Sequence, residues 1–147
     1  MTETFSDSFL DAVIDSLLPG ETDSAGGTPL PAATGAGLAG RSYGARHAAV
    51  LAAIGREAGG EQAFAGAAAA QRKRVLEAVE QSLSGPFRAL VQELVADYHE
   101  RPQVLAAYGW RAEPPQPLGH RVEAADAAAW AGLDKVKARG PIWRVAP

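Results

Sequence analysis

The chain has 147 residues, a formal net charge of −3 and no cysteine. The lack of cysteine excludes disulfides, thiolate metal sites and thiol catalysis, and the acidic balance gives no support for nucleic acid or an anionic membrane as a partner. Hydrophobic residues make up 47% of the chain, and because alanine supplies many of them, the composition favours closely packed helices in one domain.

The first predicted helix begins near Phe5 and runs to Leu18, where Pro19-Gly20 ends it. Its apolar residues recur every three or four positions, which is the pattern of a helix with one buried face. Asp11 and Asp15 lie beside this stripe and share a face that we expect to be solvated. No window of the chain approaches the 18 apolar residues of a membrane span, and the acidic start does not resemble a leader, so the sequence predicts a cytoplasmic protein. Export together with a partner that carries a leader stays open.

Further apolar stripes predict helices over residues 47–58, 61–83 and 84–98, and a short helix over residues 102–108. Gly59-Gly60 is a predicted C-cap of the first of these, and Gly66 is a candidate division within the second. The basic run Gln71-Arg72-Lys73-Arg74 is expected to be the solvated face of its helix.

A glycine-rich loop over residues 21–40 contains the pattern G-x-G-x-x-G from Gly35 to Gly40, with Glu57 22 residues beyond Gly35. This pattern binds dinucleotides only where a buried strand leads into it and a helix follows as part of a βαβ unit. The preceding residues, SAGGTPLPAAT, do not form a strand pattern. We therefore interpret the match as chance and predict no nucleotide site.

The C-terminal quarter carries aromatic and proline residues. After Gly109, Trp110 is followed by three prolines in four residues, at Pro114, Pro115 and Pro117, which predicts a stiff extended arm. Asp126 is a predicted N-cap of a short helix that carries Trp130 and Leu133, and residues 134–139 add a turn. The apolar end Ile142-Trp143-Arg144 is expected to dock on the helices or on a partner.

The sequence offers few groups for catalysis. His47, His99 and His120 are not at the spacing of any metal-binding motif, and no nucleophile motif is present. We predict no catalytic, cofactor-binding or metal-binding residue in this chain. An alternative is an independent helical enzyme or ligand-binding domain that uses a pocket lined by Tyr98, His99 and Glu100.

The segment Arg111-x-x-Pro114-x-x-Pro117 fits the ligand pattern that SH3 domains bind. Such patterns are common in proline-rich loops. We interpret the segment as an ordered ribbon within one assembly.

Two segments resemble a known family, the gluconate 2-dehydrogenase subunit 3 family. The longer one contains Tyr98-His99-Glu100-Arg101-Pro102-x-Val104, then Ala107-Tyr108-Gly109-Trp110, then Pro114-Pro115-Gln116-Pro117-Leu118-Gly119-His120. The shorter one is Phe9-x-x-x-x-Ile14-Asp15-x-Leu17-Leu18-Pro19-Gly20, which is similar to the opening of that family. Arg101 departs from the family pattern, which commonly has aspartate before the proline.

The resemblance implies a small helical accessory subunit. Its partner would be a large FAD-dependent dehydrogenase of the glucose–methanol–choline type that oxidises sugars or glycosides, and the FAD would belong to that partner. The family's small subunit supports folding, stability or export of the large one and has no known catalytic residues to transfer.

Together these observations predict an all-α bundle of four or five main helices with a proline-rich extended arm and an irregular C-terminal tail. We expect one domain over residues 1–147, with a helical core over 1–108 and the arm and docked tail over 109–147. The predicted partner surface consists of Tyr108, Trp110, Pro114, Pro115, Pro117, Ile142, Trp143 and Arg144. Alternatively, the arm and tail pack over the chain's own helices, or the chain is a scaffold for an unrelated protein.

Overall fold

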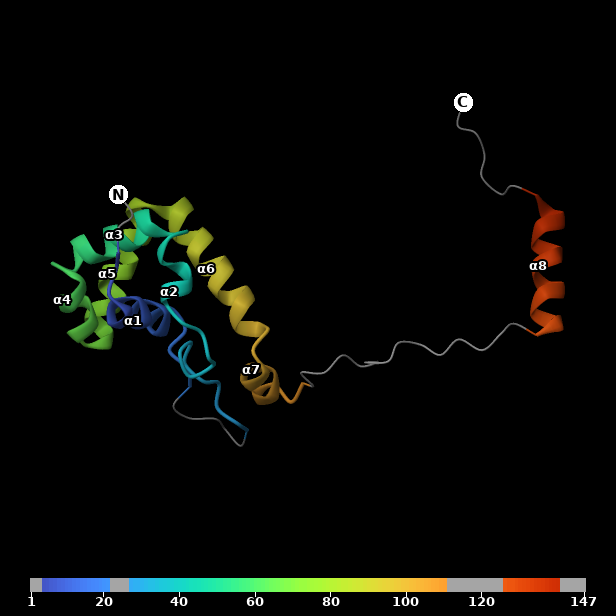
Figure 1. The fold of residues 1–147 in the computed structure, drawn as a ribbon, viewed down its shortest axis with the longest axis horizontal. Coiled ribbons are helices and arrows are strands. Elements are labelled where there is room, and N and C mark those ends of the chain that lie inside the picture. The colour runs from blue at the N-terminus through green and yellow to red at the C-terminus, as the bar shows by residue number, and fades with distance from the viewer. Residues whose placement is uncertain (1–3, 22–26, 111–125, 141–147) are drawn as a thin grey trace, which may run out of the picture. The chain divides into compact units, whose positions relative to one another are not determined.

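The structure is a computed structural model that describes residues 4–21, 27–110 and 126–140. These residues form eight helices and no strand, which confirms the predicted all-α fold (Figure 1). The chain divides into two compact units, Met1–Glu113 (unit 1) and Pro114–Pro147 (unit 2). The single domain expected over the whole chain stays a prediction.

Five of the eight helices have ten or more residues, in agreement with the predicted four or five main helices. The short α2 was not predicted, because four residues are too few to show an apolar period. Unit 1 contains α1 (Asp7–Leu17), α2 (Arg41–Gly44), α3 (Ala48–Glu57), α4 (Glu61–Gly66), α5 (Ala69–Ser82), α6 (Ser84–His99) and α7 (Pro102–Ala107), and unit 2 contains α8 (Ala127–Arg139).

Glycines end helices where the sequence places them. Gly59 follows α3 in the left-handed region, with φ at +79°, and the Gly60 N–H donates to the carbonyl of Gly55 at 2.8 Å, so unpaired carbonyls at the helix end are satisfied. Gly66 closes α4, and α5 starts at Ala69. The region expected over residues 61–83 is therefore two helices.

The prediction of a solvated face over residues 71–74 was wrong for Arg72. Its side chain is half-buried rather than exposed, and its Nε donates to the carbonyl of Phe64 at 3.0 Å. Nη2 donates to the carbonyl of Ala65, and the guanidinium lies over the Phe64 ring, 5.8 Å from its centroid. Arg72 thus caps the end of α4, where a cation is favoured by the helix dipole.

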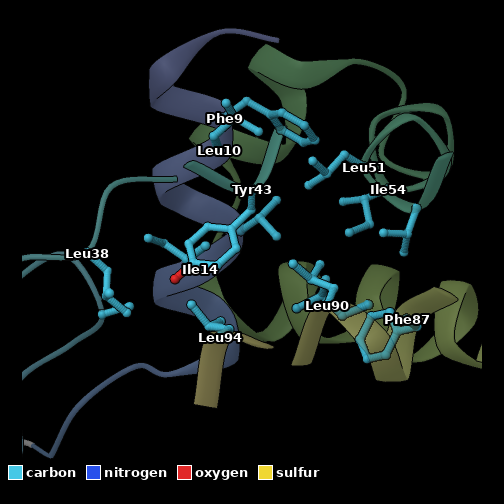
Figure 2. Packing of buried hydrophobic residues seen from close by; sticks show 14 of the residues in the cluster. Phe9, Leu10, Ile14, Leu38, Tyr43, Leu51, Ile54, Phe87, Leu90 and Leu94 are labelled. Carbon is cyan, nitrogen blue, oxygen red and sulfur yellow. The ribbon is translucent and has the colours of Figure 1, made fainter. Parts of the chain in front are cut away.

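The core of unit 1 is formed by side chains from all seven of its helices and from the loop between α1 and α2. Helix α1 packs against α2, α4 and α5, while α3 packs against α4, α5 and α6. Figure 2 shows residues of α1, α2, α3 and α6 converging on one another. The most deeply buried of the large side chains are Phe9, Val13, Ile14, Tyr43, Val50, Leu51, Ile54, Phe64, Leu90, Leu94 and Val104.

Asp11 and Asp15 anchor the loop over residues 27–40 to α1. The Asp15 carboxylate accepts hydrogen bonds from the backbone N–H and the hydroxyl of Thr34, at 2.8 and 2.7 Å, and Asp11 accepts one from the N–H of Gly40 at 2.8 Å. Both aspartates are half-buried. The expectation that this face is solvated was wrong, because the loop folds back over it and supplies donors that replace water.

Gly40 belongs to the G-x-G-x-x-G pattern, and the structure gives it a packing role. A Cβ built on Gly40 would lie 2.4 Å from the backbone carbon of Leu10 and 2.6 Å from its carbonyl oxygen. Only a residue without a side chain allows the loop this close to α1. No strand precedes the loop in the described residues.

Leu94 lies on α6 with no exposed surface. Replacing it with alanine removes buried methyl groups and leaves a cavity, so Leu94→Ala should lower the free energy of unfolding by about 2–5 kcal/mol. Arg74→Ala, on the exposed side of α5, should change it by less than about 0.5 kcal/mol. Urea titrations followed by circular dichroism measure both. Equal midpoints for the two variants would contradict this placement of α6.

Gly40→Ala should destabilise unit 1 by about 1–3 kcal/mol, because the new methyl group overlaps the α1 backbone and forces the loop outward. Gly85→Ala is the matched control. Gly85 lies in the first turn of α6 with nothing within 4 Å of an added Cβ, so alanine should stabilise the protein slightly there. Thermal unfolding of both variants tests the contrast, and an unchanged Gly40→Ala midpoint would show that the loop is not held closely to α1.

Candidate functional site

The end of unit 1 is a break between two helices followed by a tight cap. The chain leaves α6 at His99, and Arg101 is extended because Pro102 disfavours a helical residue before it. Pro102 then opens α7, a position where its missing N–H costs nothing. Gly109 has φ at +71°, and the Trp110 N–H donates to the carbonyl of Leu105 at 2.8 Å. This cap fixes the direction in which Trp110 leaves α7.

Tyr98, His99, Tyr108 and Trp110 form a continuous row of rings, which we call the aromatic row. Adjacent ring centroids are 5.5 Å apart for Tyr98 and His99, 5.9 Å for His99 and Tyr108, and 5.4 Å for Tyr108 and Trp110. The rings of His99 and Tyr108 are nearly parallel, at 12°. These separations are those of interacting aromatic pairs.

The row begins in the core and ends in solvent. Tyr98 is 4% exposed, whereas Tyr108 is 44% and Trp110 is 64% exposed. Tyr108 and Trp110 are the two predicted partner-surface residues that the structure describes, and both are accessible. The others, Pro114, Pro115, Pro117, Ile142, Trp143 and Arg144, lie outside the described residues.

Tyr98 connects the aromatic row to the loop over residues 27–40, because its hydroxyl donates a hydrogen bond to the carbonyl of Pro31 at 2.6 Å. Burial raises the pKa of Tyr98, and the nearby Tyr108 and Glu21 raise it further. The hydroxyl therefore stays protonated at neutral pH and acts as a structural donor.

A hollow of about 240 Å³ lies beside the aromatic row. Tyr98 and His99, but not Glu100, line it together with Leu18, Pro19, Gly20, Glu21, Leu30 and Tyr108. The Nδ1 of His99 lies 2.8 Å from the carbonyl of Val95. Because a carbonyl only accepts, Nδ1 carries the proton, and this bond fixes the orientation of the ring.

A cluster of polar side chains joins α2 and the residues between α2 and α3 to α6. The Tyr43 hydroxyl donates a hydrogen bond to the Asp97 carboxylate at 2.8 Å. The Glu93 carboxylate forms an ion pair with Arg46 at 2.5 Å, and its other oxygen lies 2.7 Å from Nε2 of His47. Burial of Tyr43, followed by its hydrogen bond to Asp97, raises its pKa well above the usual value. No pattern in the sequence predicts these pairs, since their partners are 46 to 54 positions apart.

Helix α8 is continuous over 13 residues, and it includes residues 134–139, where the sequence predicted a further turn. The carbonyl of Asp126, the predicted cap, accepts the N–H of Trp130 at 3.1 Å. Trp130, Leu133 and Val136 are 56%, 44% and 64% exposed. Their three-residue spacing puts them along one side of the helix. This apolar face of α8 was absent from the predicted partner surface, although the spacing could have revealed it.

Within the described stretches, no histidine, aspartate and glutamate side chains gather in threes to hold a metal ion. In the same stretches, no helix has the length and apolar character needed to cross a membrane. No family model, no curated protein and no solved structure matches this chain.

The substitution Tyr43→Phe tests the hydrogen bond between Tyr43 and Asp97 through the pH dependence of the protein's stability. The folded protein holds the Tyr43 proton more tightly than the unfolded chain does, so this contribution to stability is present below pH 10, the ordinary pKa, and is lost as the pH rises beyond it. The variant should be less stable at pH 7 by about 1–3 kcal/mol, because Asp97 loses its donor. Its stability should also fall less steeply than that of the wild type above pH 10.

Urea unfolding at a series of pH values from neutral to alkaline measures this difference. Gly85→Ala, which changes no titratable group and has open space for the new Cβ, is the control, and its stability should fall with pH as steeply as that of the wild type. Parallel curves for the wild type and Tyr43→Phe would contradict the assignment of the shift to Tyr43.

Proposed function

We propose that this chain is the non-catalytic small subunit of an oxidoreductase complex, which binds and stabilises a large FAD-dependent dehydrogenase or oxidase of the glucose–methanol–choline type. In this proposal the FAD belongs to the large subunit, and the substrate is a sugar or glycoside. The observation that carries the proposal is the exposure of Trp110 beside Tyr108, on a backbone held by the Gly109 cap.

Exposed tryptophan and tyrosine on a rigid backbone suit a protein interface. Such side chains bury a large area with few torsions to immobilise, and interface residues with the largest energetic effect are enriched in them. Trp110 is 64% exposed and is preceded by a hydrogen-bonded turn, so little further ordering is needed when a partner covers it.

The apolar face of α8 supports a second contact. Isolated helices of 12 to 15 residues are marginally stable in water, and α8 has 13 residues with three large apolar side chains exposed. Covering Trp130, Leu133 and Val136 on a partner would both stabilise the helix and add affinity. Coupled ordering of this kind is common for accessory segments.

The resemblance to the gluconate 2-dehydrogenase subunit 3 family supplies the identity of the partner. The residues on which this resemblance rests lie together in the structure. They form the end of α6 at Tyr98 and His99, the break at Pro102, and the cap at Gly109-Trp110. Among the aromatic residues of this segment, Tyr98 is buried, whereas Tyr108 and Trp110 are exposed and accessible to a partner.

Trp110→Ala should leave the helical circular-dichroism spectrum and the melting temperature unchanged, because the side chain is largely exposed. The same substitution should weaken binding to a co-expressed flavin-containing large subunit by roughly thirtyfold, which corresponds to about 2 kcal/mol. The measurement is affinity purification from the native host followed by flavin absorbance of the eluate. Trp130→Ala should have the same effect through α8.

Arg74→Ala is the control and should change neither folding nor flavin recovery, since Arg74 is exposed on the polar, charged face of α5. A wild-type chain that recovers no flavoprotein would refute the proposed function. If flavoprotein is recovered equally by all variants, the partner is right but the interface is elsewhere.

A further inference from the structure

The hollow beside the aromatic row has two unlike walls. On one side are the rings of Tyr98, His99 and Tyr108, and on the other are Leu30 and the turn over residues 18–21 that follows α1. The turn is held in place by the hydrogen bond from the Glu21 N–H to the carbonyl of Leu30, at 2.8 Å, and by the left-handed Gly20, whose added Cβ would lie 2.5 Å from the N of Ala32. The hollow is thus formed by backbone that does not need a ligand to hold its shape.

Two polar atoms of the aromatic wall are already paired within the chain. The hydroxyl of Tyr98 donates to Pro31, and the Nδ1 of His99 bonds the carbonyl of Val95. What the wall offers to a ligand is therefore mainly ring surface. Ring surface of this kind favours a ligand that is apolar and poor in hydrogen-bond donors, and a proline ring on an extended backbone meets both conditions.

A negative charge completes the hollow. Glu21 lines it, and its charge is among the causes that raise the pKa of Tyr98 inside it. One oxygen of the carboxylate accepts the N–H of Leu30 at 3.3 Å, which orients the group while leaving it exposed. A ligand with a lysine or arginine beside its prolines would complement this charge, as proline-rich ligands commonly do.

We propose that this hollow is a binding site for an extended, proline-containing segment of a partner protein that carries a basic residue next to its prolines. The prolines pack on the exposed rings of His99 and Tyr108, and the basic residue pairs with Glu21. Trp110 continues the ring surface beyond Tyr108. This inference rests on the geometry of the hollow and holds whether or not the partner is a flavoenzyme.

A labelled synthetic peptide, RAEPPQPLG, is a suitable probe because it contains an arginine and three prolines in the ligand pattern already noted at residues 111–119. Fluorescence polarisation with the full chain should show saturable binding, and a peptide with all three prolines replaced by alanine should bind at least about tenfold more weakly. Tyr108→Ala should weaken binding of the first peptide by a similar factor.

Glu21→Gln keeps the shape of the side chain and removes its charge. It should weaken binding by up to about fivefold, as expected for an exposed ion pair, and should make binding less sensitive to added salt. Arg74→Ala is the control, because Arg74 is exposed on α5 and does not line the hollow, and it should not change peptide binding.

The full chain with Pro114, Pro115 and Pro117 all replaced by alanine is assayed in parallel. If only this variant binds the peptide, the chain's own segment is the occupant, and a partner segment as occupant is overturned. If neither chain binds, or if Arg74→Ala weakens binding as much as Tyr108→Ala, the hollow is not a peptide site. Flavin recovery by the wild type is unaffected by these outcomes, so the two proposals fail separately.

Discussion

The carboxylates of Asp11 and Asp15 hold a glycine-rich loop against α1, and the hollow beside the aromatic row depends on that contact. The two side chains are one helical turn apart and accept backbone N–H groups of the loop at 2.8 Å. Charge-assisted hydrogen bonds of this kind are stronger than neutral ones, and they satisfy backbone donors that would otherwise be shielded from water. The loop in turn supplies the carbonyl of Pro31 that fixes Tyr98, and Leu30 for the wall of the hollow. A chain whose loop detached from α1 would lose that wall of the hollow.

The aromatic row shows how backbone chemistry places side chains at low cost. Pro102 ends one helix and starts the next, and Gly109 adopts a left-handed conformation that other residues avoid. These two residues, less than two helical turns apart, turn the chain so that Tyr108 stacks on His99 from the preceding helix. The rings then support one another, which restricts their rotamers before any partner arrives. Pre-organisation of this kind lowers the entropic cost of binding.

The two units carry different kinds of exposed apolar surface. In unit 1 the exposed rings lie next to a buried core that includes Tyr98 and Val104, so their backbone is held whether or not a partner is present. In unit 2 the helix α8 exposes Trp130, Leu133 and Val136, and a helix of this length gains most of its stability from packing. The first surface suits rigid docking, and the second suits folding coupled to binding. A partner that covers both would combine the two modes.

The sequence by itself determined the helical fold and the breaks at Pro102 and Gly109, because helix propensity, proline and glycine act within a few residues of one another. It also predicted helix over both parts of α8, since no breaker separates Leu133 from the residues that follow. Only the tertiary structure decided what lies far apart in the chain. The pairing of Asp11 and Asp15 with a loop 19 to 29 residues away, the bond between Tyr43 and Asp97 and the hollow beside His99 all depend on how helices pack. Periodicity shows which face of a helix is apolar, but not which distant backbone will cover the polar side of it.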